Sequence, residues 1–92
     1  TTGETDNIRL RQNYPNPFHN NTTIEYNVLN KSEVVIQVFD SNLRLVDEIN
    51  EGVRLSGSYK LDYNNPRLDD NTYFYKLITS GNSGLKKMIK VR

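Results

Sequence analysis

The sequence predicts an all-β protein, a β-sandwich of seven short strands. Apolar and polar residues alternate with period two in several short segments, which is the pattern of strands with one buried face. Clusters of Gly, Pro, Asn, Asp and Ser separate these segments at spacings of about 8 to 14 residues. No segment shows the period of an amphipathic helix. The 92 residues are enough for one domain with a single modest core.

The chain begins with residues 1–7, which are small and polar and show no periodicity. This composition predicts a flexible linker, so the folded domain is expected to span residues 8–92. Ile8 and Leu10 then begin a short first strand, which could extend to Tyr14. No N-terminal signal peptide is visible.

Residues 13–18, called the proline corner, contain two prolines separated by one asparagine. Proline fixes its own φ and disfavours the helical region for the preceding residue, so the backbone must run extended or in turns. Tyr14 and Phe18 flank the prolines and are expected to fold back as an apolar plug. The side-chain amides of Asn13 and Asn16 are expected to bond the backbone of the turn. The corner is therefore predicted to be rigid and buried.

Two alternating strands follow the corner, and the second begins a hairpin. The predicted inward row of the first strand is Ile24, Tyr26 and Val28, and that of the second is Val34, Ile36 and Val38. Residues 40–42 predict a turn, because Asn tolerates positive φ and Asp and Ser bond nearby backbone amides. Residues 43–49 are predicted to return as the hairpin partner, with faces that their alternation does not assign.

Three more strands are predicted in the C-terminal half. Their inward rows are expected to be Tyr59, Leu61 and Tyr63, then Tyr73, Tyr75 and Leu77, and finally Leu85, Ile89 and Val91. Two glycines in residues 80–84 predict a hairpin loop before the last strand. The outward row of that strand is expected to be Lys86, Met88, Lys90 and Arg92. Such a basic row discourages aggregation between exposed strand edges.

Composition excludes several classes of protein. With 12 basic and 11 acidic residues the net charge is +1, which gives no reason to expect a nucleic-acid partner. The absence of cysteine excludes disulfides, thiol catalysis and zinc–thiolate sites. The apolar runs are too short for a membrane-spanning helix, so no membrane insertion is expected.

Candidate catalytic and metal-binding residues are few. His19 is the only histidine, has no neighbouring nucleophile or paired carboxylate, and is interpreted as a polar turn residue. Asp69 and Asp70 with Asp62 could bind calcium weakly, but a solvated loop is the preferred interpretation. We therefore predict no catalytic residue, no metal site and no cofactor.

Tyrosines at four alternating positions could instead form a platform on which a sugar stacks; they are Tyr59, Tyr63, Tyr73 and Tyr75. Because their alternation matches a buried strand face, packing in the core is the preferred interpretation.

The order of these motifs resembles the type A C-terminal sorting domains of the type IX secretion system. The resemblance runs in the expected order from roughly residue 8 to the end of the chain. It is carried first by residues 10–18 and 22–26, and then by residues 34–46, 57–61, 73–77 and 86–89. The signature residues are Asn13, Tyr14, Pro15, Asn16, Pro17, Phe18, Gly57 and Tyr73.

Three positions depart from the family pattern. Leu43 stands where the family commonly has the glycine of the hairpin turn, so positive φ is expected at Asn42 instead. Tyr63 stands where Trp is frequent and keeps an aromatic anchor in the core. Asn71 replaces a frequent glycine, and Asn is the next-best residue for a left-handed conformation.

The resemblance implies a seven-stranded immunoglobulin-like β-sandwich that is a delivery signal and not an enzyme. Domains of this family sit at the C-terminus of cargo proteins that have already crossed the inner membrane of a Gram-negative cell. The outer-membrane translocon recognises the folded domain, and a sortase-type cysteine protease usually removes it and can join the cargo to lipopolysaccharide. The expected location is the periplasm in transit, and then the cell surface or the medium.

Two segments are expected to meet these partners. The sortase is expected to act near Thr2, Gly3 and Glu4. The translocon is expected to contact the terminal strand, by pairing with its edge, by touching its basic row, or both. The residues of that strand are Lys86, Lys87, Met88, Ile89, Lys90, Val91 and Arg92. The alternative function, from a different class, is a carbohydrate-binding or spacer module of a secreted glycan-degrading enzyme.

Overall fold

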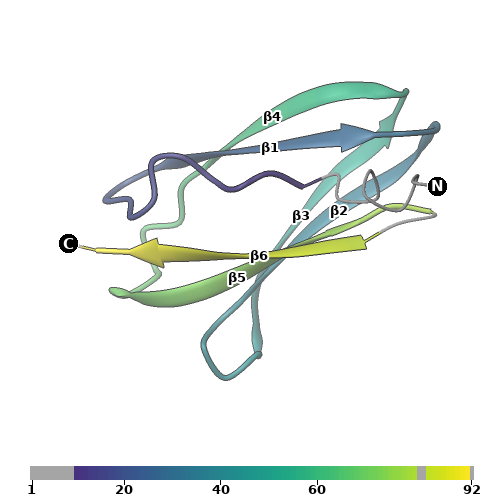
Figure 1. Ribbon diagram of the computed structural model, residues 1–92. Coiled ribbons are helices and arrows are strands. Elements are labelled where there is room, and N and C mark those ends of the chain that lie inside the picture. The colour runs from purple at the N-terminus through teal and green to yellow at the C-terminus, as the bar shows by residue number, and fades with distance from the viewer. Residues whose placement is uncertain (1–9, 81–82, 92) are drawn as a thin grey trace, which may run out of the picture.

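The computed structural model describes residues 10–80 and 83–91, and these residues form an all-β fold in two sheets (Figure 1). The strands are β1 (Thr22–Val28), β2 (Ser32–Phe39), β3 (Leu45–Arg54), β4 (Gly57–Tyr63), β5 (Asn71–Ile78) and β6 (Ser83–Lys90). The described residues contain these six strands, one fewer than predicted, and no helix that could span a membrane.

The predicted first strand is not found among the described residues. Of its residues, Leu10 makes only an isolated bridge to Tyr26 and Tyr14 only one to Thr23, while Ile8 lies outside the described residues. The predicted linker, residues 1–7, lies outside them as well. The immunoglobulin-like topology stays a prediction.

All strand pairs are antiparallel, and the chain crosses between the two sheets. β1 pairs with β4, and the larger sheet has the order β3–β2–β5–β6. The bridges of Leu10 and Tyr14 lie along β1, so the segment before the corner extends the smaller sheet. Figure 1 shows this segment, in purple, between β1 and β6.

One apolar core lies between the sheets, and the predicted alternation of β1, β2 and β5 is confirmed. Its buried members are Leu10, Phe18, Ile24, Tyr26, Val28, Val34, Ile36, Val38, Tyr63, Leu68, Tyr73, Tyr75, Leu77 and Met88. Tyr59 and Leu61 of β4 are half-buried against it. Of the four tyrosines that could have formed a sugar platform, three are therefore buried in the core, which confirms the preferred interpretation.

The predicted faces of β6 are wrong. Cross-strand pairing places Met88 beside Tyr73 and Lys86 beside Tyr75, so the row of Lys86, Met88 and Lys90 faces the core. Met88 is fully buried and the two lysines are half-buried, whereas Leu85 is 55% exposed. Both rows of this strand contain apolar residues, and the long lysine stems can run along apolar surface while the charge reaches solvent. Alternation alone could not distinguish the two faces.

The turn between β2 and β3 also differs from the prediction, because Leu43 itself adopts positive φ, at 65°. Asp40 organises the turn: its Oδ1 accepts hydrogen bonds from the N–H groups of Asn42 and Arg44, both at 2.9 Å. Its carbonyl accepts the N–H of Leu43 at 2.9 Å. The turn chemistry of Asp40 was predicted correctly, but the left-handed residue was not.

Candidate functional site

The proline corner lies against the edge of β6, so the two segments singled out from the sequence meet in space (Figure 1). Phe18 donates its N–H to the carbonyl of Ile89 at 2.9 Å, and its own carbonyl accepts the N–H of Val91 at 2.8 Å. These two bonds form a short parallel bridge beside Lys90. The chain thus adds its own backbone to the last strand.

Two side chains form hydrogen bonds with further backbone groups of this edge. Asn16 Oδ1 accepts the N–H of Ile89 at 2.9 Å, and Gln12 Nε2 donates to the carbonyl of Lys87 at 2.6 Å. A free strand edge is a template for pairing with another chain. From Lys87 to Val91, the corner and Gln12 cover that template.

A buried asparagine holds the corner in shape. The side chain of Asn13 is 2% exposed, and its Nδ2 donates to Thr22 Oγ1 at 2.9 Å and to the carbonyl of Pro15 at 3.2 Å. Thr22 Oγ1 donates to the same carbonyl at 2.9 Å. The peptide bonds before Pro15 and Pro17 are both cis. Asn13 therefore bonds turn backbone as the sequence predicted, whereas Asn16 bonds β6 instead.

The hydroxyl of Tyr75 on β5 bonds the backbone at the start of the corner. It accepts the N–H of Asn13 and donates to the carbonyl of Arg11, both at 2.7 Å. Burial of the ring raises the pKa of Tyr75 to about 12, because the charged phenolate is poorly solvated there. This role of Tyr75, like that of Gln12, was not found from the sequence, since nothing in the pattern links positions more than 60 residues apart.

The predicted apolar plug is half right. Phe18 is fully buried, but Tyr14 is 45% exposed. Tyr14 pairs with Thr23 through its backbone, and its hydroxyl donates to the carboxylate of Glu25, a bond that raises the pKa of Tyr14. The pairing with β1 turns the ring toward solvent.

The other signature residues have structural positions away from the bonds between the corner and β6. Gly57 begins β4 opposite Val28 with φ +152°, a conformation that side-chain-bearing residues rarely adopt. Tyr73 is 4% exposed and donates its hydroxyl to the carbonyl of Asp69 at 2.9 Å. The proposed processing residues, Thr2, Gly3 and Glu4, and the terminal Arg92 lie outside the described residues.

Positive charge is concentrated on the β5–β6 hairpin. Residues 71–78 and 83–90 contain four lysines and no acidic residue, whereas residues 10–70 contain six basic and nine acidic residues. The ion pairs among the described residues are Arg44–Asp40, Arg54–Glu51 and Lys60–Glu25. None of these pairs includes a β5–β6 lysine.

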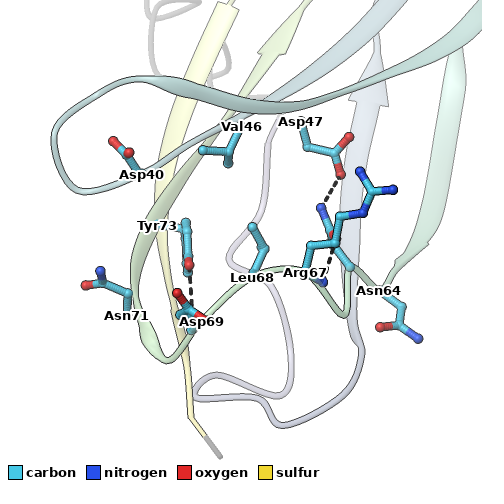
Figure 2. A pocket seen from close by; sticks show the side chains of 10 residues that line it. Asp40, Val46, Asp47, Asn64, Arg67, Leu68, Asp69, Asn71 and Tyr73 are labelled. Carbon is cyan, nitrogen blue, oxygen red and sulfur yellow. Dashed lines mark hydrogen bonds between the residues drawn. The ribbon is translucent and has the colours of Figure 1, made fainter.

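A polar hollow of about 640 Å³ lies between the β2–β3 turn and the loop after β4 (Figure 2). Asp47 Oδ2 accepts hydrogen bonds from Tyr63 at 2.8 Å and Asn65 at 3.0 Å, so this carboxylate supports the loop. Asp69 lines the hollow, whereas Asp62 lies on β4 and accepts a bond from Thr23. Within the part of the chain that the structure describes, no group of three or more acidic or histidine side chains could hold a metal ion.

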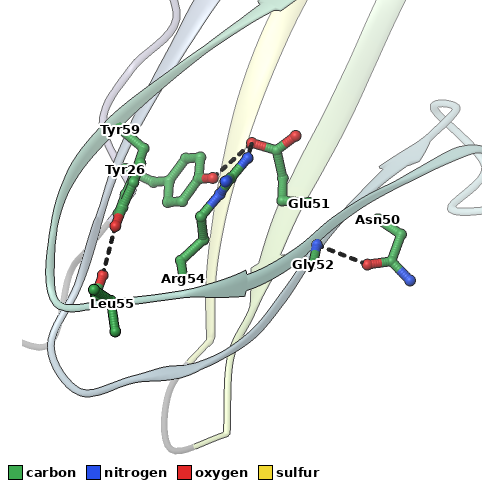
Figure 3. Close-up of polar contacts among 7 residues, drawn as sticks. All are labelled: Tyr26, Asn50, Glu51, Gly52, Arg54, Leu55 and Tyr59. Carbon is green, nitrogen blue, oxygen red and sulfur yellow. Dashed lines mark hydrogen bonds and ion pairs between the residues drawn. The ribbon is translucent and has the colours of Figure 1, made fainter.

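A second polar cluster joins β3 to the smaller sheet (Figure 3). Tyr26 donates its hydroxyl to Glu51 Oε1 at 2.6 Å, and its ring stacks on Tyr59 with centroids 5.6 Å apart. The guanidinium of Arg54 lies 5.4 Å from the centre of the Tyr59 ring and pairs with Glu51 at 3.7 Å. Burial, followed by the bond to Glu51, raises the pKa of Tyr26. Gly52, at φ 78°, lies at the irregularity of β3 beside this cluster. These contacts connect the two sheets.

A small all-β module that presents a fixed corner and a cationic strand has the features of a recognition domain. A family model described as a secretion system C-terminal sorting domain matches residues 12–91, and the chain belongs to this family. The family consists of sorting signals of type IX secretion, not of enzymes, and its members act with the secretion machinery in export across the outer membrane of Gram-negative bacteria. No curated protein and no solved structure gives a significant match.

Proposed function

We propose that this domain is a folded export signal whose recognition face is β6 together with the corner bonded to it. The partner is the type IX translocon, and the cargo precedes the domain in the precursor. A sortase-type cysteine protease then removes the domain and can attach the cargo to lipopolysaccharide at the cell surface. Family membership supports the role, and the bonds between the corner and β6 support the position of the face.

The single observation that carries the proposal is the occupied edge of β6. A partner strand could pair there only by displacing Phe18, whose side chain is fully buried, together with the bonds of Asn16 and Gln12. Of the two recognition modes expected from the sequence, edge pairing is therefore disfavoured. The remaining mode is contact with Lys86, Lys87 and Lys90 of β6, which form no ion pair with another described residue.

The lysine mode can be tested by fusing a reporter cargo to the domain in a bacterium with type IX secretion. Changing Lys86, Lys87 and Lys90 to Gln should leave folding nearly intact, since exposed or half-exposed charges contribute less than about 1 kcal/mol each. We expect the parent fusion on the surface or in the medium and the Gln variant largely in the periplasm, as measured by cell fractionation.

Deletion of residues 89–92 is the harsher companion variant, because it also removes the backbone partners of Phe18. We expect its cargo to remain in the periplasm. If the deletion variant reached the surface as well as the parent, this end of the chain would not carry the signal. If only the Gln variant behaved normally, recognition would lie in the strand and the corner and not in the charges.

Processing is proposed within residues 1–7 or just upstream of them, near Thr2, Gly3 and Glu4. Leu10 is fully buried and bridges to Tyr26, so a cut beyond it would remove part of the core. N-terminal sequencing of the domain released by the native host should therefore give a start before Leu10. A start beyond Tyr14 would contradict the proposed position of the scissile bond.

A further inference from the structure

We propose that the outer face of the larger sheet carries a second docking surface, for an acidic and apolar protein segment of the secretion machinery. The surface is a groove of about 400 Å³ lined by Phe39, Leu43, Lys76 and Leu85, called the Leu43 groove. The inference rests on the proposed function, because it names a further contact of the same export signal.

Cross-strand pairing explains why these side chains are neighbours. Phe39 pairs with Phe74, and Lys76 pairs with Leu85, so residues from β2, β5 and β6 share the outer face. On this face Leu85 is 55% exposed, and Leu45, which pairs with Phe39, is 52% exposed. Contiguous apolar residues rimmed by charge are typical of interaction sites.

The backbone at Leu43 provides an independent argument. Leu43 has φ 65° and a side chain that is 64% exposed. A left-handed conformation is unfavourable for leucine, and Gly or Asn would adopt it more easily. Such strain tends to persist at functional positions. At Leu43 it displays a large apolar side chain on the wall of the groove, where folding alone does not require one.

Charge identifies the chemistry of the occupant. Lys76 lines the groove, and Lys87 lies on the same outer face, paired across the strands with Phe74. Neither lysine belongs to an ion pair among the described residues, and the β5–β6 hairpin contains no acidic residue. A second copy of this domain would bring the same positive charges together, because a two-fold interface repeats each patch on itself. A segment with an apolar side chain between carboxylates would fill the groove and pair with the lysines.

The test uses the reporter fusion with variants that leave Lys86, Lys87 and Lys90 unchanged. The groove variant is Leu43→Asn with Leu85→Thr, and the charge variant is Lys76→Glu. Their matched controls are Leu29→Asn, at a leucine that is 48% exposed in another turn, and Lys31→Glu, at an exposed lysine. We expect export to fall about tenfold in the groove variant and in the charge variant, as for loss of an interface hot spot. Export of both controls should stay near the parent level.

Folding is checked on the purified domains by thermal denaturation. Because Asn tolerates positive φ and Leu85 is 55% exposed, the groove variant Leu43→Asn with Leu85→Thr should melt within a few degrees of the parent. A variant that stays folded at the growth temperature but is poorly exported cannot be explained by unfolding. Suppressor mutations that restore export of Lys76→Glu should change an acidic residue of a secretion component to a basic one.

Three results would overturn the inference. Groove variants could be exported like the parent, or the purified domain could dimerise through Leu85 in sedimentation experiments. Alternatively, it could bind phosphatidylglycerol vesicles in a manner abolished by Lys76→Glu, which would make a lipid the occupant. If the parent fusion itself stayed in the periplasm, the proposed function would fail, which distinguishes that failure from failure of the groove.

Discussion

Asn13 is the residue on which the shape of the corner most depends. Its buried amide bonds a carbonyl and a hydroxyl of the turn, while its backbone N–H is taken by Tyr75. Buried polar groups must find such partners, because an unpaired one costs about 1–3 kcal/mol. The asparagine of the signature is therefore required by geometry that an apolar residue of similar size could not satisfy.

Phe18→Ala should strongly destabilise the domain. The Phe18 side chain is fully buried, and truncating a buried Phe to Ala costs roughly 3–5 kcal/mol in free energy of unfolding. Urea denaturation of the purified domain measures this loss. Tyr14→Ala is the matched control, because Tyr14 is 45% exposed and should cost far less. Equal losses for the two variants would show that burial does not explain the role of Phe18.

At the scale of single residues the sequence predicted the non-helical backbone of the corner, the burial of Phe18 and the turn chemistry of Asp40. The prediction that the corner as a whole is buried was wrong, because Tyr14, Pro15, Asn16 and Pro17 are exposed. The sequence did not predict the exposure of Tyr14 or the positive φ of Leu43. Both depend on pairing: Tyr14 is turned outward by Thr23, and the bonds to Asp40 place the left-handed residue one position later than expected. Local preferences cannot supply such long-range or competing constraints.

Among the elements, β6 differs most from a simple alternating strand. Its inward row carries two lysines around Met88, and its outward row carries Leu85 and Ile89. Strand existence was predictable because turn residues bound each segment, but the faces of β6 required knowledge of its pairing with β5. The predicted first strand has a similar outcome within the described residues, where Leu10 and Tyr14 make isolated bridges to β1 and no continuous ladder.

Tyr75→Phe should loosen the corner while leaving the β5 ring packed. The change removes one hydroxyl and leaves the Asn13 N–H and the Arg11 carbonyl without that partner, at a cost of about 1–3 kcal/mol. Hydrogen exchange should then accelerate at Asn13 and at Ile89, whose N–H is bonded by the corner. Tyr73→Phe is the control, because its hydroxyl bonds Asp69 instead. Unchanged exchange at Ile89 would show that loosening the corner does not weaken its bond to β6.

Across the whole molecule, tyrosine hydroxyls connect elements that the apolar core alone would leave less fixed. Tyr26 bonds Glu51, Tyr63 bonds Asp47 and Tyr75 bonds the corner. Burial raises the pKa of all three hydroxyls, so each is kept neutral over a wider pH range than in the unfolded chain. These bonds were not predictable, although the choice of Tyr over Phe in inward rows signals that polar partners are present.

The domain should therefore lose stability in alkali. An unfolded Tyr75 releases its proton near pH 10, whereas the folded one keeps it until about pH 12. Above about pH 10 the unfolded state binds fewer protons, so the free energy of unfolding falls as pH rises and this contribution is lost by about pH 12. Two pKa units correspond to about 2.7 kcal/mol. Denaturation series at rising pH measure the decline, and Tyr75→Phe should make it shallower; a flat profile would contradict burial of the hydroxyl as the cause.

The bonds that Asn16 of the corner and the preceding Gln12 make with β6 join residues 73 and 75 positions apart, respectively. Synthesis runs from the N-terminus, so the ribosome makes the corner well before its partners in β6. A precursor whose translation stops before β6 lacks the backbone groups of Ile89 and Val91 that bond Phe18. The closed corner thus distinguishes a finished domain from an unfinished one, and a receptor that requires it would reject truncated proteins before they are committed to export.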